Sequence, residues 1–110
     1  MYEYRAKLIK IIDGDTIDAE IDLGFNISVK KRVRFLGINA PETRTRDLVE
    51  KRAGLKVKSR LEALFDASDG TFTLKSHGVG KFGRCLGEIF IDKVNINELL
   101  LKEGLVTKYQ

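Results

Sequence analysis

The first 35 residues repeat one pattern, in which apolar and polar side chains alternate between short polar interruptions. Within residues 16–23 the apolar side chains fall on one face and the acidic ones on the other, as in a strand buried on one side. Residues 4–12 and 27–35 alternate similarly, although Lys31 falls on the apolar face. The interruptions are Asp13-Gly14-Asp15 and Gly24-Phe25-Asn26. Together these features predict three strands joined by tight turns.

A longer period governs residues 48–65, where apolar residues recur at helical spacing with lysine and arginine between them. This pattern predicts an amphipathic helix with a basic outer face. Gly54 lies inside it and lowers its helix propensity by about 1 kcal/mol, so we expect a close contact between helix and sheet there. Asn95 followed by Glu98 resembles a capping box and predicts a short helix over residues 96–103.

Two further strands are expected, one around residues 72–74 and one over 86–91. The order of three strands, a helix, two strands and a helix indicates an α+β, mainly β, fold. Five short strands suit a small closed barrel of the oligonucleotide-binding type, the OB-fold, although composition alone leaves an open sheet equally consistent. A chain of 110 residues is expected to form a single domain over residues 1–110.

Charge and cysteine content narrow the classes of partner and metal. Lysine and arginine total 20 against 16 acidic residues, and this net charge of +4 suits a polyanionic partner without requiring one. One cysteine and one histidine exclude a zinc site built from those two residue types alone, so any metal must be bound by oxygen. We interpret Cys85 as a small buried residue and His77 as a solvated loop histidine.

The sequence shows no apolar run long enough to span a membrane, and residues 1–5 lack the basic and then apolar order of a signal peptide. A cytoplasmic protein without a membrane partner is therefore expected for the chain as written. A leader removed beforehand would instead give a secreted protein. We expect a monomer.

Hard oxygen ligands follow two of the predicted strands. Asp15 opens the second strand, whereas Asn39 and Ala40 follow the third, so carboxylate, amide and main-chain oxygens are available to one hard cation. Glu42 comes directly after Pro41, which stiffens its approach, and its carboxylate suits proton transfer from water. The plainer alternatives are an ordinary turn around Asp15 and a surface ion pair at Glu42.

Two arginines in the same set of segments add guanidinium groups to these acids. Arg34 lies near the end of the third strand and Arg84 follows a glycine in a turn. A guanidinium can donate paired hydrogen bonds to phosphate oxygens in a planar fork, which a lysine ammonium cannot do. Arginines on strands and turns more often form solvated ion pairs, so neither residue is decisive alone.

Three segments in this order resemble the staphylococcal nuclease (thermonuclease) family. They are residues 11–16 (IIDGDT), 33–42 (VRFLGINAPE) and 81–84 (KFGR). The resemblance extends from about Ile9 to Val106, and three ordered motifs are more specific than any one of them. It implies an OB-fold barrel and calcium-dependent hydrolysis of DNA and RNA phosphodiesters, leaving 3′-phosphates and 5′-hydroxyls.

The resemblance also implies a calcium site. Asp15 matches a ligand aspartate, Ala40 would offer its carbonyl oxygen, and Asn39 takes the place of a second ligand aspartate. This last replacement keeps an oxygen ligand but removes a negative charge, so we expect weaker calcium binding, or use of another divalent ion.

The remaining matches concern catalysis and the substrate. Glu42 matches the acid that orients or deprotonates water, and Arg34 and Arg84 match a phosphate-binding pair. Phe82 stands where the family often has a tyrosine that contacts substrate. Because a pure binding protein needs only charge and stacking surfaces, these residues favour a nuclease over the alternative, a non-catalytic OB-fold module that binds nucleic acid. The sequence leaves DNA and RNA equally consistent as substrates.

Overall fold

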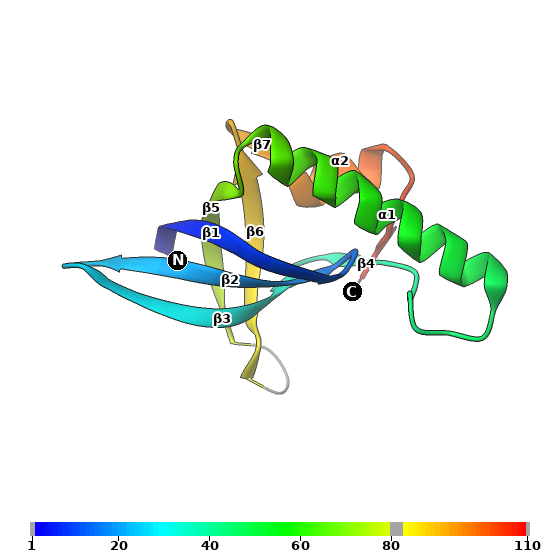
Figure 1. The fold of residues 1–110 in the computed structure, drawn as a ribbon, viewed down its shortest axis with the longest axis horizontal. Coiled ribbons are helices and arrows are strands. Elements are labelled where there is room, and N and C mark those ends of the chain that lie inside the picture. Colours follow the sequence, from blue (N-terminus) through cyan, green and yellow to red (C-terminus); the bar gives the residue numbers. More distant parts are fainter. Residues whose placement is uncertain (1, 80–82, 110) are drawn as a thin grey trace.

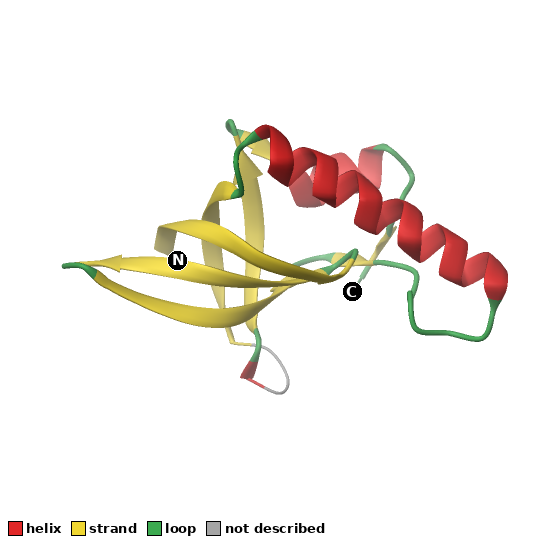
Figure 2. Cartoon of the chain, viewed as in Figure 1, coloured by secondary structure: helices red, strands yellow, loops and turns green. Residues whose placement is uncertain are grey.

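The computed structural model describes residues 2–79 and 83–109 as a β-barrel with two helices packed against one end (Figure 1). The barrel strands are β1 (Tyr2–Asp13), β2 (Thr16–Gly24), β3 (Ile27–Phe35), β5 (Thr71–Val79) and β6 (Cys85–Ile91). The helices are α1 (Leu48–Ala67) and α2 (Ile96–Lys102). Three two-residue strands complete the fold: β4 (Ile38–Asn39), β7 (Val94–Asn95) and β8 (Thr107–Lys108). Figure 2 shows how strongly strands dominate the chain.

The pairing of the strands confirms the expected α+β class and decides between a barrel and an open sheet. The sheet order is β3-β2-β1-β5-β6, and its neighbours are antiparallel. A parallel pairing of β3 with β6, through Val33–Phe35 and Cys85–Gly87, joins the two ends and closes five strands into a barrel. That closure leaves no unpaired edge where β3 ends, which is where the predicted site residues begin.

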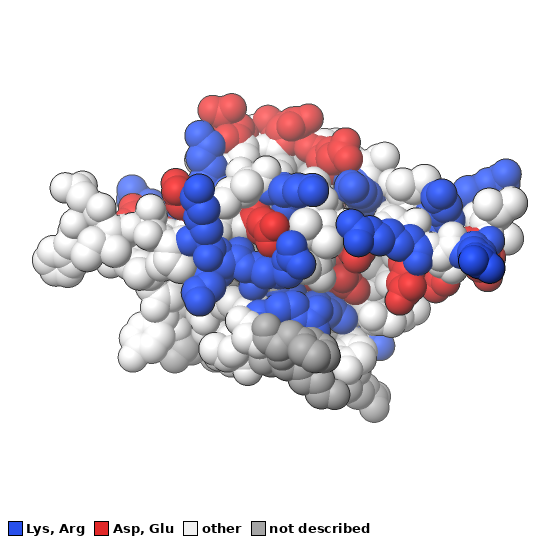
Figure 3. Space-filling model, turned by 60° about the horizontal axis from the view of Figure 1, so that its bottom comes forward, with Lys and Arg blue, Asp and Glu red and all other residues white. Residues whose placement is uncertain are grey.

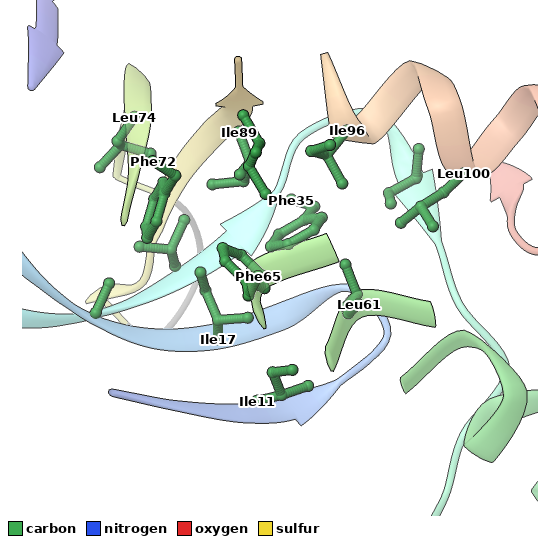
Figure 4. Packing of buried hydrophobic residues seen from close by; sticks show 14 of the residues in the cluster. Ile11, Ile17, Phe35, Leu61, Phe65, Phe72, Leu74, Ile89, Ile96 and Leu100 are labelled. Atoms are coloured by element: carbon green, nitrogen blue, oxygen red, sulfur yellow. The ribbon is translucent and has the colours of Figure 1, made fainter. Parts of the chain in front are cut away.

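Alternation along the strands produces the barrel core. The inward residues of β2 and β3, including Ile17 and Phe35, are almost completely buried. In Figure 4, Phe65 of α1 lies between Ile17 and Phe35 with Leu61 nearby, and Ile96 and Leu100 of α2 lie beyond Phe35. The helices therefore plug one end of the barrel, and the phenylalanines of α1 and β5, Phe65 and Phe72, meet edge to face at 5.4 Å between ring centroids.

Local signals account for the ends of the helices. The Asp47 carboxylate accepts hydrogen bonds from the backbone N–H groups of Val49 and Glu50, which caps the start of α1. Asn95 caps α2 by accepting from the N–H of Glu98, as predicted. Gly104 follows α2 with a φ of 74°, the left-handed conformation expected at a helix end. Neither helix in the described residues is both long and apolar enough to span a membrane.

Buried Asn97 joins α2 to the barrel. Its amide oxygen accepts from the N–H of Ile89, and its amide nitrogen donates to the carbonyl oxygens of Leu36 and Gly87. These three bonds link α2 to backbone groups of β6 and of the chain just after β3, and the Gly87 carbonyl also accepts from the N–H of Leu36. Asn97 thus fixes the position at which the chain leaves β3 for the candidate site.

Candidate active site

Asp15 occupies the tight turn between β1 and β2, held against α1 by a close contact at Gly14. A Cβ atom built on Gly14 would lie 2.5 Å from the Cγ1 atom of Val57 and 2.9 Å from the Cβ atom of Ala40. Only glycine therefore fits between the helix and the segment after β4. This contact brings the two loops that carry the predicted ligands into the same place.

The Asp15 carboxylate is buried and bonded on both oxygens. Oδ1 accepts a hydrogen bond from the Thr16 hydroxyl at 3.0 Å, and Oδ2 accepts one from the N–H of Ala40 at 2.9 Å. The Nη2 atom of Arg34 lies 3.5 Å from Oδ2. A buried charge requires such partners. The turn is thus more than an ordinary surface turn, since its acid ties β2 to the chain after β4.

Arg34 lies on β3 opposite Thr16, with only 13% of its side chain exposed. Its Nη1 atom donates to the carbonyl oxygens of Phe35 and Ile38 at 2.9 and 2.8 Å. Because both Nη1 hydrogens are used inside the protein, a phosphate would meet the Nη2 edge, where the contacts to Asp15 and Asn39 are longer. This arginine is accordingly not the solvated ion pair that strand arginines usually form.

The predicted ligands Asn39 and Ala40 lie beside Arg34 at the end of β4. The Nη2 atom of Arg34 is 3.5 Å from the Oδ1 atom of Asn39, as it is from Asp15. Pairing of β4 with β8 anchors Asn39, whose carbonyl accepts from the Thr107 hydroxyl at 3.3 Å. Carboxylate and amide oxygens from segments distant in sequence therefore converge on a single nitrogen atom.

The types of oxygen atom at this site suit a hard cation, but the site supplies little negative charge to bind it. Oxygens of Asp15, Asn39 and Ala40 are the ligand types that calcium accepts, with water completing a shell of six to eight. Among residues 2–79 and 83–109, no three or more His, Cys, Asp and Glu side chains are grouped to hold a metal. A cation here would depend on one carboxylate and on neutral oxygens, with the Arg34 guanidinium close by.

Glu42 is exposed, and its backbone is held by a second close glycine contact. A Cβ atom built on Gly54 would lie 2.7 Å from the carbonyl oxygen of Glu42 and 2.8 Å from that of Pro41. The sequence predicted a close contact of Gly54 with the sheet; the contact is instead with this loop. The next residue, Thr43, donates its hydroxyl hydrogen bond to Asp13 at 2.7 Å, so the loop is tied on both sides.

Arg84 lines an open pocket of about 540 Å³ on the outside of the barrel, together with Asp13, Thr16 and Arg32. Thr16 adjoins Asp15 in the chain, so the pocket lies next to the acid. Arg32 also hydrogen-bonds Asp18, and this bond is the main reason that the pKa of Asp18 lies below its usual value. Phe82, the predicted substrate contact, lies outside the described residues.

Comparison with known proteins supplies the family. Residues 32–110 match the family described as "Staphylococcal nuclease homologue", which is more than half of the chain. The chain belongs to this family. The match confirms the resemblance that the three motifs indicated, although Asp15 lies before the matched residues and its role is a prediction from its motif and contacts.

Several curated relatives of this staphylococcal nuclease homologue carry nuclease names. The micrococcal nuclease of Shigella flexneri is 27% identical over 98% of this chain and 60% of its own length. The endonuclease YncB of Bacillus subtilis is 30% identical over 89% of this chain and 44% of its own length. The thermonuclease of Staphylococcus hyicus is 26% identical over 94% and 58%. This chain thus spans about half the length of these relatives.

Two features of this family member were not found from the sequence. Tyr109 stacks on Arg34, with the guanidinium carbon 5.5 Å from the ring centroid, and its N–H donates to the carbonyl of Gly37. No motif signals this contact because Tyr109 lies about 75 residues from its partner. His77 was interpreted as a solvated loop residue; it lies in β5 and contacts Glu88 at 2.7 Å.

Proposed function

We propose that this protein hydrolyses phosphodiester bonds in DNA and RNA as a calcium-dependent endonuclease, leaving 3′-phosphate and 5′-hydroxyl ends. One observation carries the proposal most directly: oxygens of Asp15 and Asn39 gather around one nitrogen of Arg34. Family membership and the nuclease names of the relatives support it.

Phosphate binding is assigned to the two arginines. A phosphodiester that approaches the Nη2 edge of Arg34 displaces only its long contacts and leaves both Nη1 bonds intact. Tyr109 covers the guanidinium and restricts its movement. Arg84 lines the pocket with Thr16, the residue that faces Arg34 across β2 and β3. In this assignment two guanidinium groups, of which Arg34 is held in place by its bonds, stabilise the negative charge that increases on the phosphate during attack.

Proton transfer is assigned to Glu42. Its exposed carboxylate can orient an attacking water and accept its proton, while the Gly54 contact and the Thr43 bond fix the backbone that carries it. A calcium ion bound by Asp15, Asn39 and Ala40 would supply a further positive charge beside the scissile phosphate. In this assignment the protein orients the phosphate and moves the proton of the water.

A cleavage assay with purified protein tests the proposal. Single-stranded DNA and RNA are incubated across a calcium titration, with EDTA and magnesium as controls, and the product ends are analysed for 3′-phosphate. We expect cutting that requires calcium and that needs a high concentration of it because Asn39 carries no charge. Binding without cutting at every metal concentration would establish the non-catalytic OB-fold module instead.

A further inference from the structure

The turn between β2 and β3 places an aromatic ring where the backbone disfavours one. Phe25 and Asn26 form a two-residue turn with φ values of 55° and 60°, the left-handed conformation that favours asparagine or glycine. A bulky residue with positive φ is uncommon because this conformation strains the backbone. The Phe25 side chain gains no burial in return, because 96% of the residue is exposed. Strain without packing suggests that the ring serves a contact outside this chain.

The outer face of β1, β2 and β3 leads from this turn to the candidate site. Strand registers place Lys7, Glu20 and Lys30 in one row across the face. The next row toward the site holds Lys10, Asp18 and Arg32. In each row a basic residue flanks the central acid on both sides. Because each central acid has two basic neighbours, both rows carry net positive charge, and the acids of β2 keep the cations aligned along the two outer strands.

Both ends of this face are hollowed. The pocket beside the site is lined by Arg32 and Arg84, among others. An open pocket of about 540 Å³ at the other end is lined by Phe25 and by two basic and two acidic residues, Arg5, Lys7, Glu20 and Asp22. Figure 3 shows lysine and arginine gathered across the middle of the molecule, with an uncharged projection at the left where the β2–β3 turn lies in Figure 1. The two rows with net positive charge therefore lie between the site and the pocket at the exposed ring, where basic and acidic residues balance.

We propose that a single strand of nucleic acid leaves the candidate site along this outer face and that a base stacks on Phe25 at its far end. From Arg34 to Ser28 the strand β3 covers six residues, or about 20 Å. OB-type grooves hold about 4 to 16 nucleotides of single strand, and a path of this length corresponds to the short end of that range. Exposed aromatic rings and basic residues along a groove are the features by which such proteins hold single strands.

This inference rests on the proposed function and adds to it a substrate path outside the site. A compact protein partner would not need cations repeated along 20 Å of strand, whereas a linear polyanion does. The inference also explains why phenylalanine occupies a turn position that asparagine would fill with less strain. It predicts that stability and binding respond in opposite directions at residue 25.

Fluorescence anisotropy with labelled oligothymidylates of three and eight nucleotides, in EDTA to prevent cutting, tests the path. Phe25→Asn should weaken binding of the eight-nucleotide strand at least about fivefold, as expected for loss of one stacked base, and leave the three-nucleotide strand unaffected. The same variant should melt at a higher temperature because the turn is relieved. Phe25→Trp should retain binding, and Lys30→Gln should lower the salt slope by about 1.

Matched controls lie on α1, away from this face. Leu48→Asn and Lys56→Gln change an exposed apolar and an exposed basic residue and should leave binding of both oligonucleotides unchanged. Equal affinity of Phe25→Asn and wild type for the eight-nucleotide strand overturns the inference, even if the wild type cuts DNA. Wild-type protein that neither binds nor cuts any oligonucleotide overturns the proposed function as well. Self-association or binding to phosphatidylserine vesicles that depends on Phe25, without an effect on oligonucleotides, replaces the proposal with another partner.

Discussion

Replacing Gly54 by alanine tests how the helix positions the loop that carries Glu42. The added Cβ atom would lie 2.7 Å from the carbonyl oxygen of Glu42, and both neighbouring contacts are with backbone atoms. Reaching an ordinary separation of about 3.4 Å requires a movement of about 0.7 Å. The helix α1 is packed into the barrel, so the loop moves rather than the helix. The hydrogen bond from Thr43 to Asp13 confines that movement to the segment that carries Glu42.

The magnitude follows from two opposing effects on stability and one on catalysis. Alanine raises helix propensity by about 1 kcal/mol, whereas crowding of a packed contact costs about 1 to 3 kcal/mol. The free energy of unfolding should therefore fall by about 0 to 2 kcal/mol. A displacement approaching 1 Å at a catalytic carboxylate lowers the turnover rate by as much as about 100-fold, so catalysis should suffer more than folding does.

Two measurements on one preparation separate these effects: thermal unfolding and the turnover rate on single-stranded DNA at saturating calcium. Ser59→Ala, on the exposed face of the same helix, controls for helix propensity and should raise stability slightly without changing turnover. A Gly54→Ala protein that is more stable than wild type and cuts DNA at the same rate would refute the reasoning, because the loop would then have room for the methyl group.

Four further predictions concern charge and hydrogen bonding. Asn39→Asp should lower the calcium concentration for half-maximal cutting at least about tenfold, because it restores a carboxylate ligand; an unchanged calcium dependence counts against Asn39 as a ligand. Arg84→Lys should slow cutting about 100-fold while keeping the charge, if its paired donors matter in the transition state. Asn97→Ala should lower the free energy of unfolding by about 1 to 3 kcal/mol, seen as a lower denaturant midpoint, because the N–H of Ile89 and the carbonyl of Leu36 lose a side-chain partner, whereas the Gly87 carbonyl keeps its bond from the N–H of Leu36. Arg32 lowers the pKa of Asp18 from 3.8, so the pair stabilises the fold above that pH and ceases to do so as pH falls through the folded-state value. Stability of Asp18→Asn should accordingly vary less with pH below about 4 than that of the wild type, and identical pH profiles would contradict this assignment.

Periodicity predicted the first three barrel strands and α1, whereas the capping box at Asn95 predicted α2. Residues 16–23 show why, since every side chain obeys the period of two and the observed β2 covers Thr16–Gly24. The two-residue strands β4, β7 and β8 carry no period, so no pattern could predict them. The pairing of β4 with β8 nevertheless anchors Asn39, and it depends on which chain segments meet after folding.

The candidate site was predictable as a set of residues and not as a set of contacts. Motifs singled out Asp15 and Arg34, but their mutual approach and the use of Nη1 for two carbonyls depend on tertiary structure. The helix propensity of Gly54 indicated a close contact without specifying its partner, which is the Glu42 loop. Lys31 interrupts the apolar face of β3 without being buried. Pairing of β3 with β6 begins only at Val33, so Lys31 lies before the closed part of the barrel and is exposed.

Cleavage of single-stranded DNA by Glu42→Gln, with Glu62→Gln as a control on the exposed face of α1, tests the account most directly. The assay compares turnover rates at saturating calcium and confirms by circular dichroism that each variant is folded. The account predicts at least about a 100-fold loss for Glu42→Gln, as for removal of a general base, and wild-type turnover for Glu62→Gln. Equal turnover by both variants, or a wild-type protein that binds DNA and never cuts it, would contradict the assignment of this fold as a nuclease.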